Sequence, residues 1–457
     1  MSKRLSPSDA WFLYGESRET MMHVAGLMVF SPPPDADPDH MRHLMDEVRE
    51  GAPVHRPWNL RLKSPDLLAH PMQAWNEIED VDVEYHVRRT ALPSPGDERE
   101  LGIVVSRLHG YGIDFHRPPW ESHLIEGLEG GRFAMYIKVH HSLVDGFSAM
   151  RIMANSLSRD PGERDRPLFF SVPQPSRPPR EEPEATGIQF PELLAAIRGQ
   201  YGATKTVARA LLKVAQGGRA LVSPRQAPKC VLNTRIGRNR RFATQIVSFA
   251  RLKAIAKAAG GTLNDVVLAL SAASLRRYLL ERDALPSAPL VALLPVSLRA
   301  KDDTGGGNAV GAILATLATD VEDPAERLST IIASTKRAKE QLQGMTRGEI
   351  MSYCALLVAP AMLQMVPQVA GKMKPTFNVT ISNVPGPDET LYFRGAQLDA
   401  SYPLSFPLHG QALNITCTSY AGSVCFGFTG CRDTVPKLQR IAVYCGEALG
   451  ELEKAIA

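Results

Sequence analysis

The sequence predicts a protein of mixed α and β structure that folds as two domains, and three observations support this fold class. The chain has 457 residues, which is more than one compact core usually holds. A proline-rich stretch interrupts it between residues 159 and 191. On each side of that stretch, apolar runs typical of strands alternate with the three- and four-residue spacing typical of helices.

Composition and charge exclude several classes of protein. Hydrophobic residues make up 44% of the chain and charged residues 22%, the mix of an ordinary globular protein rather than a disordered or collagen-like one. The formal net charge of +4 is far smaller than that of a dedicated nucleic-acid binder, so we expect no nucleic acid as a partner. The six cysteines form no C-x-x-C pair, which predicts free thiols in a reducing cytoplasm.

No apolar stretch is long enough to predict a membrane-spanning helix. The nearest candidate, Met351–Met373, is interrupted by Pro360, Pro367 and two glutamines. This pattern favours a buried helical pair or a segment lying on a bilayer surface.

Residues 1–158 form the predicted N-terminal domain. Its clearest strand is the apolar run Phe133–Val139, bounded by Gly131 before it and by two histidines after it. Gly146–Leu157 then returns to helical spacing, so a short polar loop connects this strand to a helix. The other predicted elements are a helix beginning at Asp9, a strand at His23–Phe30 and helices at Asp39–Arg49 and Arg99–Leu108.

Residues 159–228 form the predicted connection between the domains. Eight prolines fall within Arg159–Pro191, and because proline fixes φ and lacks a donor, this part is expected to be an exposed linker. Leu193–Val222 reads as one long amphipathic helix with a basic stripe formed by Lys205, Arg209 and Lys213. The stripe is either a solvated face, the interpretation with the higher prior, or a contact with anionic lipid head groups or a cofactor phosphate.

Residues 229–457 form the predicted C-terminal domain, again with both kinds of element. Thr262 has a side chain suited to an N-cap, so a helix is expected over Asn264–Arg282. Further helices are expected at Arg251–Ala259, Asp323–Leu342 and Val435–Ala455. Strands are expected where β-forming residues cluster, at Phe242–Phe249, Leu290–Pro295, Phe377–Ser382, Asn414–Tyr420 and Ser423–Thr429.

The sharpest feature of the chain is the tandem histidine motif His140-His141-Ser142-Leu143-Val144-Asp145-Gly146. A histidine near its ordinary pKa can take a proton from an alcohol or amine at neutral pH. Asp145 could orient the ring or hold the loop through an arginine, and Gly146 would permit an unusual backbone angle or a close approach of the helix. The alternative is a satisfied histidine pair in which Asp145 caps the helix.

Further motifs follow one another in a fixed order along the chain. They are Leu5-Ser6-Pro7-Ser8-Asp9-Ala10-Trp11-Phe12-Leu13, Met22-His23-Val24-Ala25-Gly26, Arg117-Pro118-Pro119-Trp120-Glu121, Asn264-Asp265-Val266-Val267-Leu268-Ala269, Pro295-Val296-Ser297-Leu298-Arg299, Gly307-Asn308 and Ser382-Asn383-Val384-Pro385-Gly386-Pro387. With the histidine motif, this series resembles the bacterial wax ester synthase/diacylglycerol acyltransferase family, whose members are related to chloramphenicol acetyltransferase and to nonribosomal condensation domains. The resemblance covers nearly the full length except the linker, and Pro119 replaces the family's usual leucine.

The resemblance implies two chloramphenicol-acetyltransferase-like α/β sandwich domains that face each other across a central channel. It also implies acyl transfer from a long-chain acyl-CoA to diacylglycerol, giving triacylglycerol, or to a fatty alcohol, giving a wax ester. By this analogy His141 is the general base that deprotonates the acceptor alcohol. His140 shapes the pocket or packs, and Asp145 is structural, with Arg299 as its candidate partner.

Five further positions are candidate substrate-binding residues by the same analogy. Asn264 and Asp265 either cap their helix or, in the case of Asn264, polarise the thioester oxygen opposite His141. Trp120 and Pro119 could line an acyl tunnel, although an indole beside prolines more often serves packing. Ser382 begins a segment through Pro387 that is predicted to be a turn near the active-site channel.

The implied chemistry requires no metal and no cofactor beyond acyl-CoA as co-substrate. Because the product is insoluble in water, the expected location is the cytoplasm with peripheral attachment to the inner membrane face or to lipid droplets. A homodimer is compatible with the sequence. Two alternatives stay open: an acyltransferase for another alcohol or amine, such as a glycolipid or polyketide, and a non-catalytic lipid-binding relative.

Overall fold

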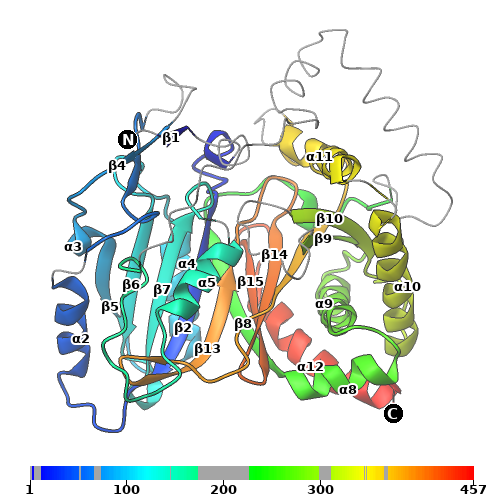
Figure 1. The fold of residues 1–457 in the computed structure, drawn as a ribbon. Coiled ribbons are helices and arrows are strands. Elements are labelled where there is room, and N and C mark those ends of the chain that lie inside the picture. Colours follow the sequence, from blue (N-terminus) through cyan, green and yellow to red (C-terminus); the bar gives the residue numbers. More distant parts are fainter. Residues whose placement is uncertain are drawn as a thin grey trace.

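The computed structural model describes residues 3–4, 12–50, 53–65, 74–144, 146–172, 226–297, 310–343, 345, 347–364 and 369–456. Within these residues the chain forms two six-stranded mixed sheets and one small three-stranded sheet, with helices packed on the faces of the large sheets (Figure 1). The predicted mixed α and β class is confirmed. The central channel stays a prediction.

The first large sheet combines four strands from the N-terminal half with two strands, β12 and β13, from the C-terminal part of the chain. Its strand order is β12-β13-β2-β7-β6-β5, and only β5 and β6 run parallel to each other. Helices α2 and α5 cover one face, and helix α4 covers the other. The bounds of these elements are β2 His23–Ser31, β5 Val87–Ala91, β6 Trp120–Glu126, β7 Phe133–His140, β12 Tyr392–Phe393, β13 Ala396–Leu404, α2 His40–Arg49, α4 Glu98–His109 and α5 Gly146–Asn155.

The second large sheet occupies the C-terminal half, in the order β10-β9-β11-β14-β15-β8. Helices α8, α9, α10 and α12 cover one face, and α11 packs against the other. The bounds are β8 Arg240–Ser248, β9 Val291–Ser297, β10 Val310–Thr316, β11 Val379–Val384, β14 Leu413–Tyr420, β15 Ser423–Cys431, α8 Phe249–Ala258, α9 Leu263–Leu280, α10 Pro324–Gln343, α11 Arg347–Leu363 and α12 Gln439–Ile456.

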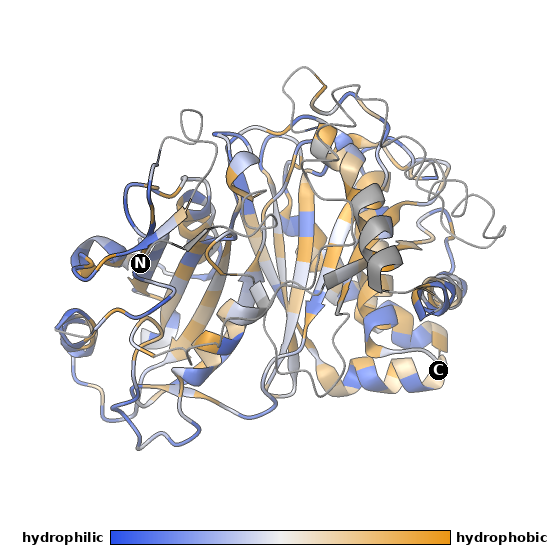
Figure 2. Cartoon of the chain, turned by 45° about the horizontal axis from the view of Figure 1, so that its top comes forward, coloured by the Kyte–Doolittle hydropathy of each residue, from blue (hydrophilic) through white to orange (hydrophobic). Residues whose placement is uncertain are grey.

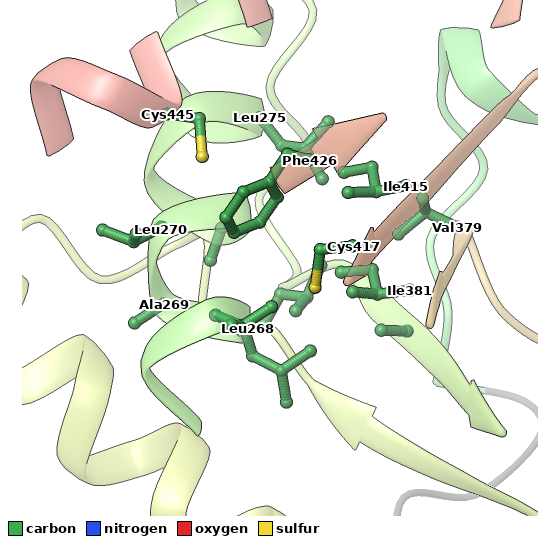
Figure 3. Close-up of a cluster of buried hydrophobic side chains, with 14 of the residues drawn as sticks. Leu268, Ala269, Leu270, Leu275, Val379, Ile381, Ile415, Cys417, Phe426 and Cys445 are labelled. Atoms are coloured by element: carbon green, nitrogen blue, oxygen red, sulfur yellow. The ribbon is translucent and has the colours of Figure 1, made fainter. Parts of the chain in front are cut away.

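The largest apolar core lies between this second sheet and helices α9 and α12. Phe426 and Cys417 project from neighbouring strands toward Leu268 and Leu275 of α9 and Cys445 of α12 (Figure 3). Hydrophobic residues are concentrated along the strands, whereas the loops are mostly hydrophilic (Figure 2). All six cysteines are free thiols, as predicted, and burial raises the pKa of Cys445 to about 12.

Strand β13 connects the two halves, because it belongs to the C-terminal part of the chain but pairs with β2 of the N-terminal sheet (Figure 1). It also packs against β15 of the second sheet. At this contact the Pro403 carbonyl oxygen would lie 2.0 Å from a Cβ at Gly427, so only glycine permits the close approach. The two halves are therefore joined both by strand pairing and by packing between the sheets. A domain boundary at residue 228 does not reflect this connection.

Smaller elements complete the described chain. Strands β1, β3 and β4 form the three-stranded sheet in the order β1-β4-β3. The bounds are β1 Lys3–Arg4, β3 Leu60–Leu62, β4 Ala74–Glu77, α3 Val83–His86, η1 Glu129–Gly131 and η2 Val231–Asn233.

The first part of the predicted exposed linker is instead packed into the N-terminal core. Leu168 and Phe169 are 5% exposed and Phe170 is fully buried, all against the face that carries α2 and α5. The prediction was wrong here because two aromatic rings and a leucine outweigh the prolines around them. The predicted long helix Leu193–Val222 lies outside the described residues.

The described residues contain no single helix that is long and apolar enough to cross a bilayer. Helices α8 and α9 satisfy that test only when they are taken together, and they are bent by 101° relative to each other.

Candidate active site

The tandem histidine motif lies where a strand, a tight turn and a helix meet. Strand β7 ends at His140, and α5 begins at Gly146, as the sequence predicts. The His140 amide donates to the Pro119 carbonyl and the His141 amide donates to the Met22 carbonyl, each at 2.9 Å. The chain segments at the ends of β6 and β2 thus hold the motif from both sides. Asp145 and Arg299 lie outside the described residues.

The His141 ring is held between two phenylalanine rings. Phe12 stacks on it with ring centroids 4.0 Å apart and an interplanar angle of 22°. Phe406, which follows β13, presents its ring edge-on at 5.9 Å. Contacts from the first residues and from the C-terminal half therefore fix the orientation of this imidazole, which stays partly accessible. An oriented, accessible imidazole is what a general base requires.

His140 points the other way and is buried. Its Nδ1 lies 2.6 Å from the Ser142 hydroxyl and accepts the Ser142 amide N–H at 3.3 Å, while Phe115 packs edge-on against the ring. Ser142 is itself buried, and its hydroxyl is committed to this contact. The pair stabilises the turn, so Ser142 is not placed as a nucleophile.

Gly146 does not need the backbone freedom of glycine. Its φ lies outside the left-handed region, and among the described residues no atom beyond its chain neighbours and its own helix backbone comes within 4 Å of where a Cβ would stand. The expected unusual backbone angle or close helix approach is therefore wrong. The position leaves open space at the first residue of α5.

Asn264 and Asp265 lie in the first turn of α9. Asp265 completes a capping box with Thr262: one carboxylate oxygen accepts the Thr262 amide at 2.8 Å and its hydroxyl at 2.7 Å. The other oxygen accepts the Thr335 hydroxyl of α10 at 2.6 Å. The capping interpretation fits Asp265 fully, because both oxygens are used. The contact of Asn264 with a thioester stays a prediction.

Trp120 is a core residue. It is 1% exposed, its indole N–H donates to the Trp58 carbonyl at 2.7 Å, and His86 stacks on it at 4.4 Å. This favours the packing interpretation of the sequence. Pro119 is buried beside it and contributes the carbonyl that receives the His140 amide.

Ser382 lies within strand β11, opposite Thr416 of β14. The predicted turn over Ser382–Pro387 was wrong for its first three residues, because β11 continues in parallel pairing through Val384. The turn starts only where Pro385 cannot donate to a neighbouring strand.

The sequence reasoning missed a row of buried polar residues on one face of the first sheet. Lys138 on β7 has no exposure, and its ammonium lies 2.5 Å from Glu121 of β6. It also donates to the carbonyls of Leu108 and Tyr111 at the end of α4. Burial alone would raise the pKa of Glu121, but contacts with His123 and Lys138 lower it to about 2. The signal was present: Tyr136, Lys138 and His140 alternate along the run that reads as apolar.

Buried histidines predict a loss of stability in mild acid. Burial lowers the pKa of His86 to about 4 and that of His109 to about 3. An unfolded chain binds these protons below about pH 6.5, and the folded chain does not. The contribution to stability is thus complete above that pH and is lost progressively as pH falls from about 6.5 to the folded pKa values.

For His86 the loss at pH 5 is about 2 kcal/mol relative to neutral pH. Thermal unfolding from pH 7.5 to pH 5 should show a falling Tm. His86→Phe should flatten this dependence, whereas His116→Phe, which changes an exposed ring, should not. A constant Tm over the range would contradict the assignment.

No group of three or more histidine, cysteine, aspartate or glutamate side chains in the described part of the chain is arranged to hold a metal ion.

Comparison with known proteins identifies the family. The model of the wax ester synthase/diacylglycerol acyltransferase catalytic domain matches residues 5–267, and that of the WS/DGAT C-terminal domain matches residues 306–453. The chain belongs to the wax ester synthase/diacylglycerol acyltransferase family. The histidine motif of this family member lies within the catalytic-domain match.

Relatives of this WS/DGAT protein match over nearly their whole length. The Mycobacterium tuberculosis protein Rv3480c, whose name describes a diacylglycerol O-acyltransferase, is 50% identical over 99% of this chain and 98% of its own. O-acyltransferase WSD of Acinetobacter baylyi is 39% identical over 99% of this chain and 97% of its own.

Solved structures agree with this WS/DGAT assignment. The wax ester synthase/diacylglycerol acyltransferase from Marinobacter aquaeolei VT8 matches with a TM-score of 0.80 and 40% identity, covering 99% of both chains. The first condensation domain of the calcium-dependent antibiotic synthetase matches with a TM-score of 0.61 at 16% identity, which supports the fold alone.

Proposed function

We propose that this protein is an O-acyltransferase that moves a long-chain acyl group from acyl-CoA to a lipid hydroxyl. The acceptor is diacylglycerol, giving triacylglycerol, or a long-chain fatty alcohol, giving a wax ester. The observation that carries the proposal is the orientation of His141 at the end of β7, between Phe12 and Phe406, in a chain of this family.

In the proposed reaction His141 removes the proton from the acceptor hydroxyl as its oxygen attacks the thioester carbon. The new C–O bond gives a tetrahedral oxyanion, which collapses with cleavage of the C–S bond. The thiolate of CoA leaves and takes the proton back from His141. Atoms and charge balance without a covalent acyl-enzyme, in keeping with the buried, committed hydroxyl of Ser142. This chemistry calls for no cofactor beyond the acyl-CoA itself.

His140 acts as a structural member of the motif in this proposal. Because its Nδ1 accepts from Ser142, the ring braces the turn that presents His141. Gly146 keeps the space at the start of α5 free of a side chain, so a substrate can lie there. Asp145 and Asn264 keep their predicted supporting roles, and Ser382 would act from strand β11 rather than from a turn.

The test is release of CoA thiol from palmitoyl-CoA in the presence of dioleoylglycerol or hexadecanol. Thiol release should depend on the acceptor, and mass spectrometry should find one ester formed per thiol. Thiol release that is equally fast without acceptor would indicate a thioesterase. A protein that binds palmitoyl-CoA but releases no thiol with either acceptor would contradict the lipid-ester proposal.

Peripheral attachment to a membrane or lipid-droplet surface is part of the same proposal, because the product leaves the water phase. Dioleoylglycerol presented in phospholipid vesicles tests it directly: the protein should float with the vesicles in a density gradient. Full activity on vesicles from which the protein separates completely would contradict stable attachment.

A further inference from the structure

The loop of residues 15–22, which leads into β2, places a carboxylate against the histidine motif. Glu16 is 13% exposed, and one of its oxygens, Oε2, accepts the Met22 amide N–H at 2.5 Å. The same oxygen lies 3.4 Å from Nε2 of His140. The Met22 amide is therefore hydrogen-bonded to this oxygen, and Nε2 of His140 faces the same oxygen without a hydrogen bond to it.

The contacts of His140 define which of its nitrogens carries the proton. The Ser142 amide N–H can only donate, so the Nδ1 that it reaches at 3.3 Å must be an acceptor. The neutral ring then carries its proton on Nε2, the nitrogen that faces Glu16. Ser142 thus holds one end of the ring by hydrogen bonding, and Glu16 contacts the other end.

A second connection runs through the backbone. The Met22 amide is held by Glu16, and the Met22 carbonyl accepts the His141 amide N–H at 2.9 Å. Glu16 therefore acts near His141 at two points. One is the backbone contact between Met22 and the His141 amide, and the other is the neighbouring His140 ring. The same N-terminal segment also supplies Phe12, which stacks on the His141 ring.

Two buried cations, Lys138 and Arg240, interact with the charge of this carboxylate. Burial lowers the pKa of Lys138, and it also lowers the pKa of Arg240 to about 10, with the negative charge of Glu16 opposing the shift in both cases. Glu19, three residues further along the loop, is directed elsewhere: it contacts Arg235 at 2.9 Å and His409 at 3.4 Å. Only Glu16 of these two carboxylates contacts the motif.

We propose that Glu16 is the positioning residue of the general base: through the Met22 amide and the His140 ring it fixes the backbone and orientation of His141. This role rests on the proposed function of His141. It requires an oxygen acceptor at Oε2 and not a full negative charge, because the Met22 amide is bonded to that oxygen and the His140 ring faces it. A glutamine with its carbonyl oxygen in that place keeps both contacts.

Three variants test the proposal: Glu16→Ala, Glu16→Gln and the matched control Glu19→Gln. We expect Glu16→Ala to lower kcat for acceptor-dependent thiol release by about 10- to 100-fold, because a small displacement of a catalytic group is enough for that loss. The KM for palmitoyl-CoA should stay within about two-fold, since the acyl-CoA does not contact Glu16 in this scheme. Glu16→Gln should restore kcat to within about three-fold of the native value, and Glu19→Gln should leave it unchanged.

An equal loss in Glu16→Gln and Glu16→Ala would overturn positioning by hydrogen bonding, as would native kcat in Glu16→Ala. If Glu16→Ala does not fold, Glu16→Gln still decides, because it keeps the volume of the side chain.

A spectroscopic measurement separates this proposal from the acyltransferase assignment. The native protein should show a downfield Nε2–H proton resonance for His140, assigned with His140→Gln and absent in Glu16→Ala. Its absence from the native protein would overturn the Glu16 contact. Its presence in a protein that releases no thiol would support the contact while the proposed function fails.

Discussion

Replacing His141 with alanine is expected to lower kcat for acceptor-dependent thiol release by about 10²- to 10⁴-fold, the usual contribution of a general base. The acceptor hydroxyl would have no group to receive its proton as the C–O bond forms. The Phe12 and Phe406 rings pack on His141 from two sides, so the variant also leaves a gap between them. The measurement is steady-state thiol release at neutral pH, with the KM for palmitoyl-CoA determined in parallel.

Two controls separate lost chemistry from lost structure. His116→Ala removes an exposed ring whose contact is with Asp114, and it should keep native kcat. The far-ultraviolet circular dichroism spectrum and the Tm of His141→Ala should stay close to those of the native protein, because the ring is only partly buried. A folded His141→Ala protein with native kcat would exclude the mechanism.

Replacing Lys138 with methionine is expected to reduce the free energy of unfolding by about 3–5 kcal/mol, the cost of breaking a buried ion pair on one side. The ammonium has no exposure and makes three contacts: with Glu121 and with the carbonyls of Leu108 and Tyr111. Without it the charged partners of Glu121 among the described residues are the more distant Arg88, at 3.7 Å, and His123, at 3.8 Å. Chemical denaturation of the native and variant proteins measures the difference.

A second substitution shows whether the unpaired carboxylate causes the loss. Lys138→Met combined with Glu121→Gln should recover part of the stability, because a neutral amide is less costly to bury than an unpaired charge. Lys253→Met on the exposed side of α8 is the matched control and should change stability by less than about 0.5 kcal/mol. A Lys138→Met protein as stable as the native one would show that the pair contributes nothing.

Elements with a regular pattern and local signals were predictable from the sequence. Strand β7 and helix α9 are examples: one is a β-forming run with clear boundaries, and the other starts at a capping threonine that the structure confirms. Short-range physics decides such elements, because side-chain periodicity and cap hydrogen bonds involve residues close in sequence.

Elements that depend on distant partners were not predictable in the same way. Strand β6 carries Glu121, Ser122 and His123, which are polar and nevertheless buried; Lys138 of β7 pairs with Glu121, and Thr90 of β5 contacts the His123 ring at 3.0 Å. The sequence of β13 does not reveal that this strand belongs to the N-terminal sheet, because its pairing with β2 joins segments far apart in the chain. The burial of Phe170 likewise depends on the tertiary core around it and cannot be read from the local sequence.

The candidate site also combines features set by the local sequence with features set by distant contacts. The position of His141 at the end of a strand could be predicted, because the motif and the strand are contiguous. The rings of Phe12 and Phe406 and the carboxylate of Glu16 could not be placed, because the tertiary fold brings them to the histidine motif from two segments far apart in the chain.

The position of β13 has a consequence for how the chain is made. On the ribosome, β2 and β7 emerge long before residues 396–404 are synthesised, at roughly 5–20 residues per second. Until then the free side of β2 is an open template for pairing with any other extended chain. The sheet of the N-terminal half therefore stays incomplete and prone to intermolecular association until residues 396–404 have been synthesised. Nascent protein that stalls or is cleaved before residue 396 is a natural substrate for chaperones.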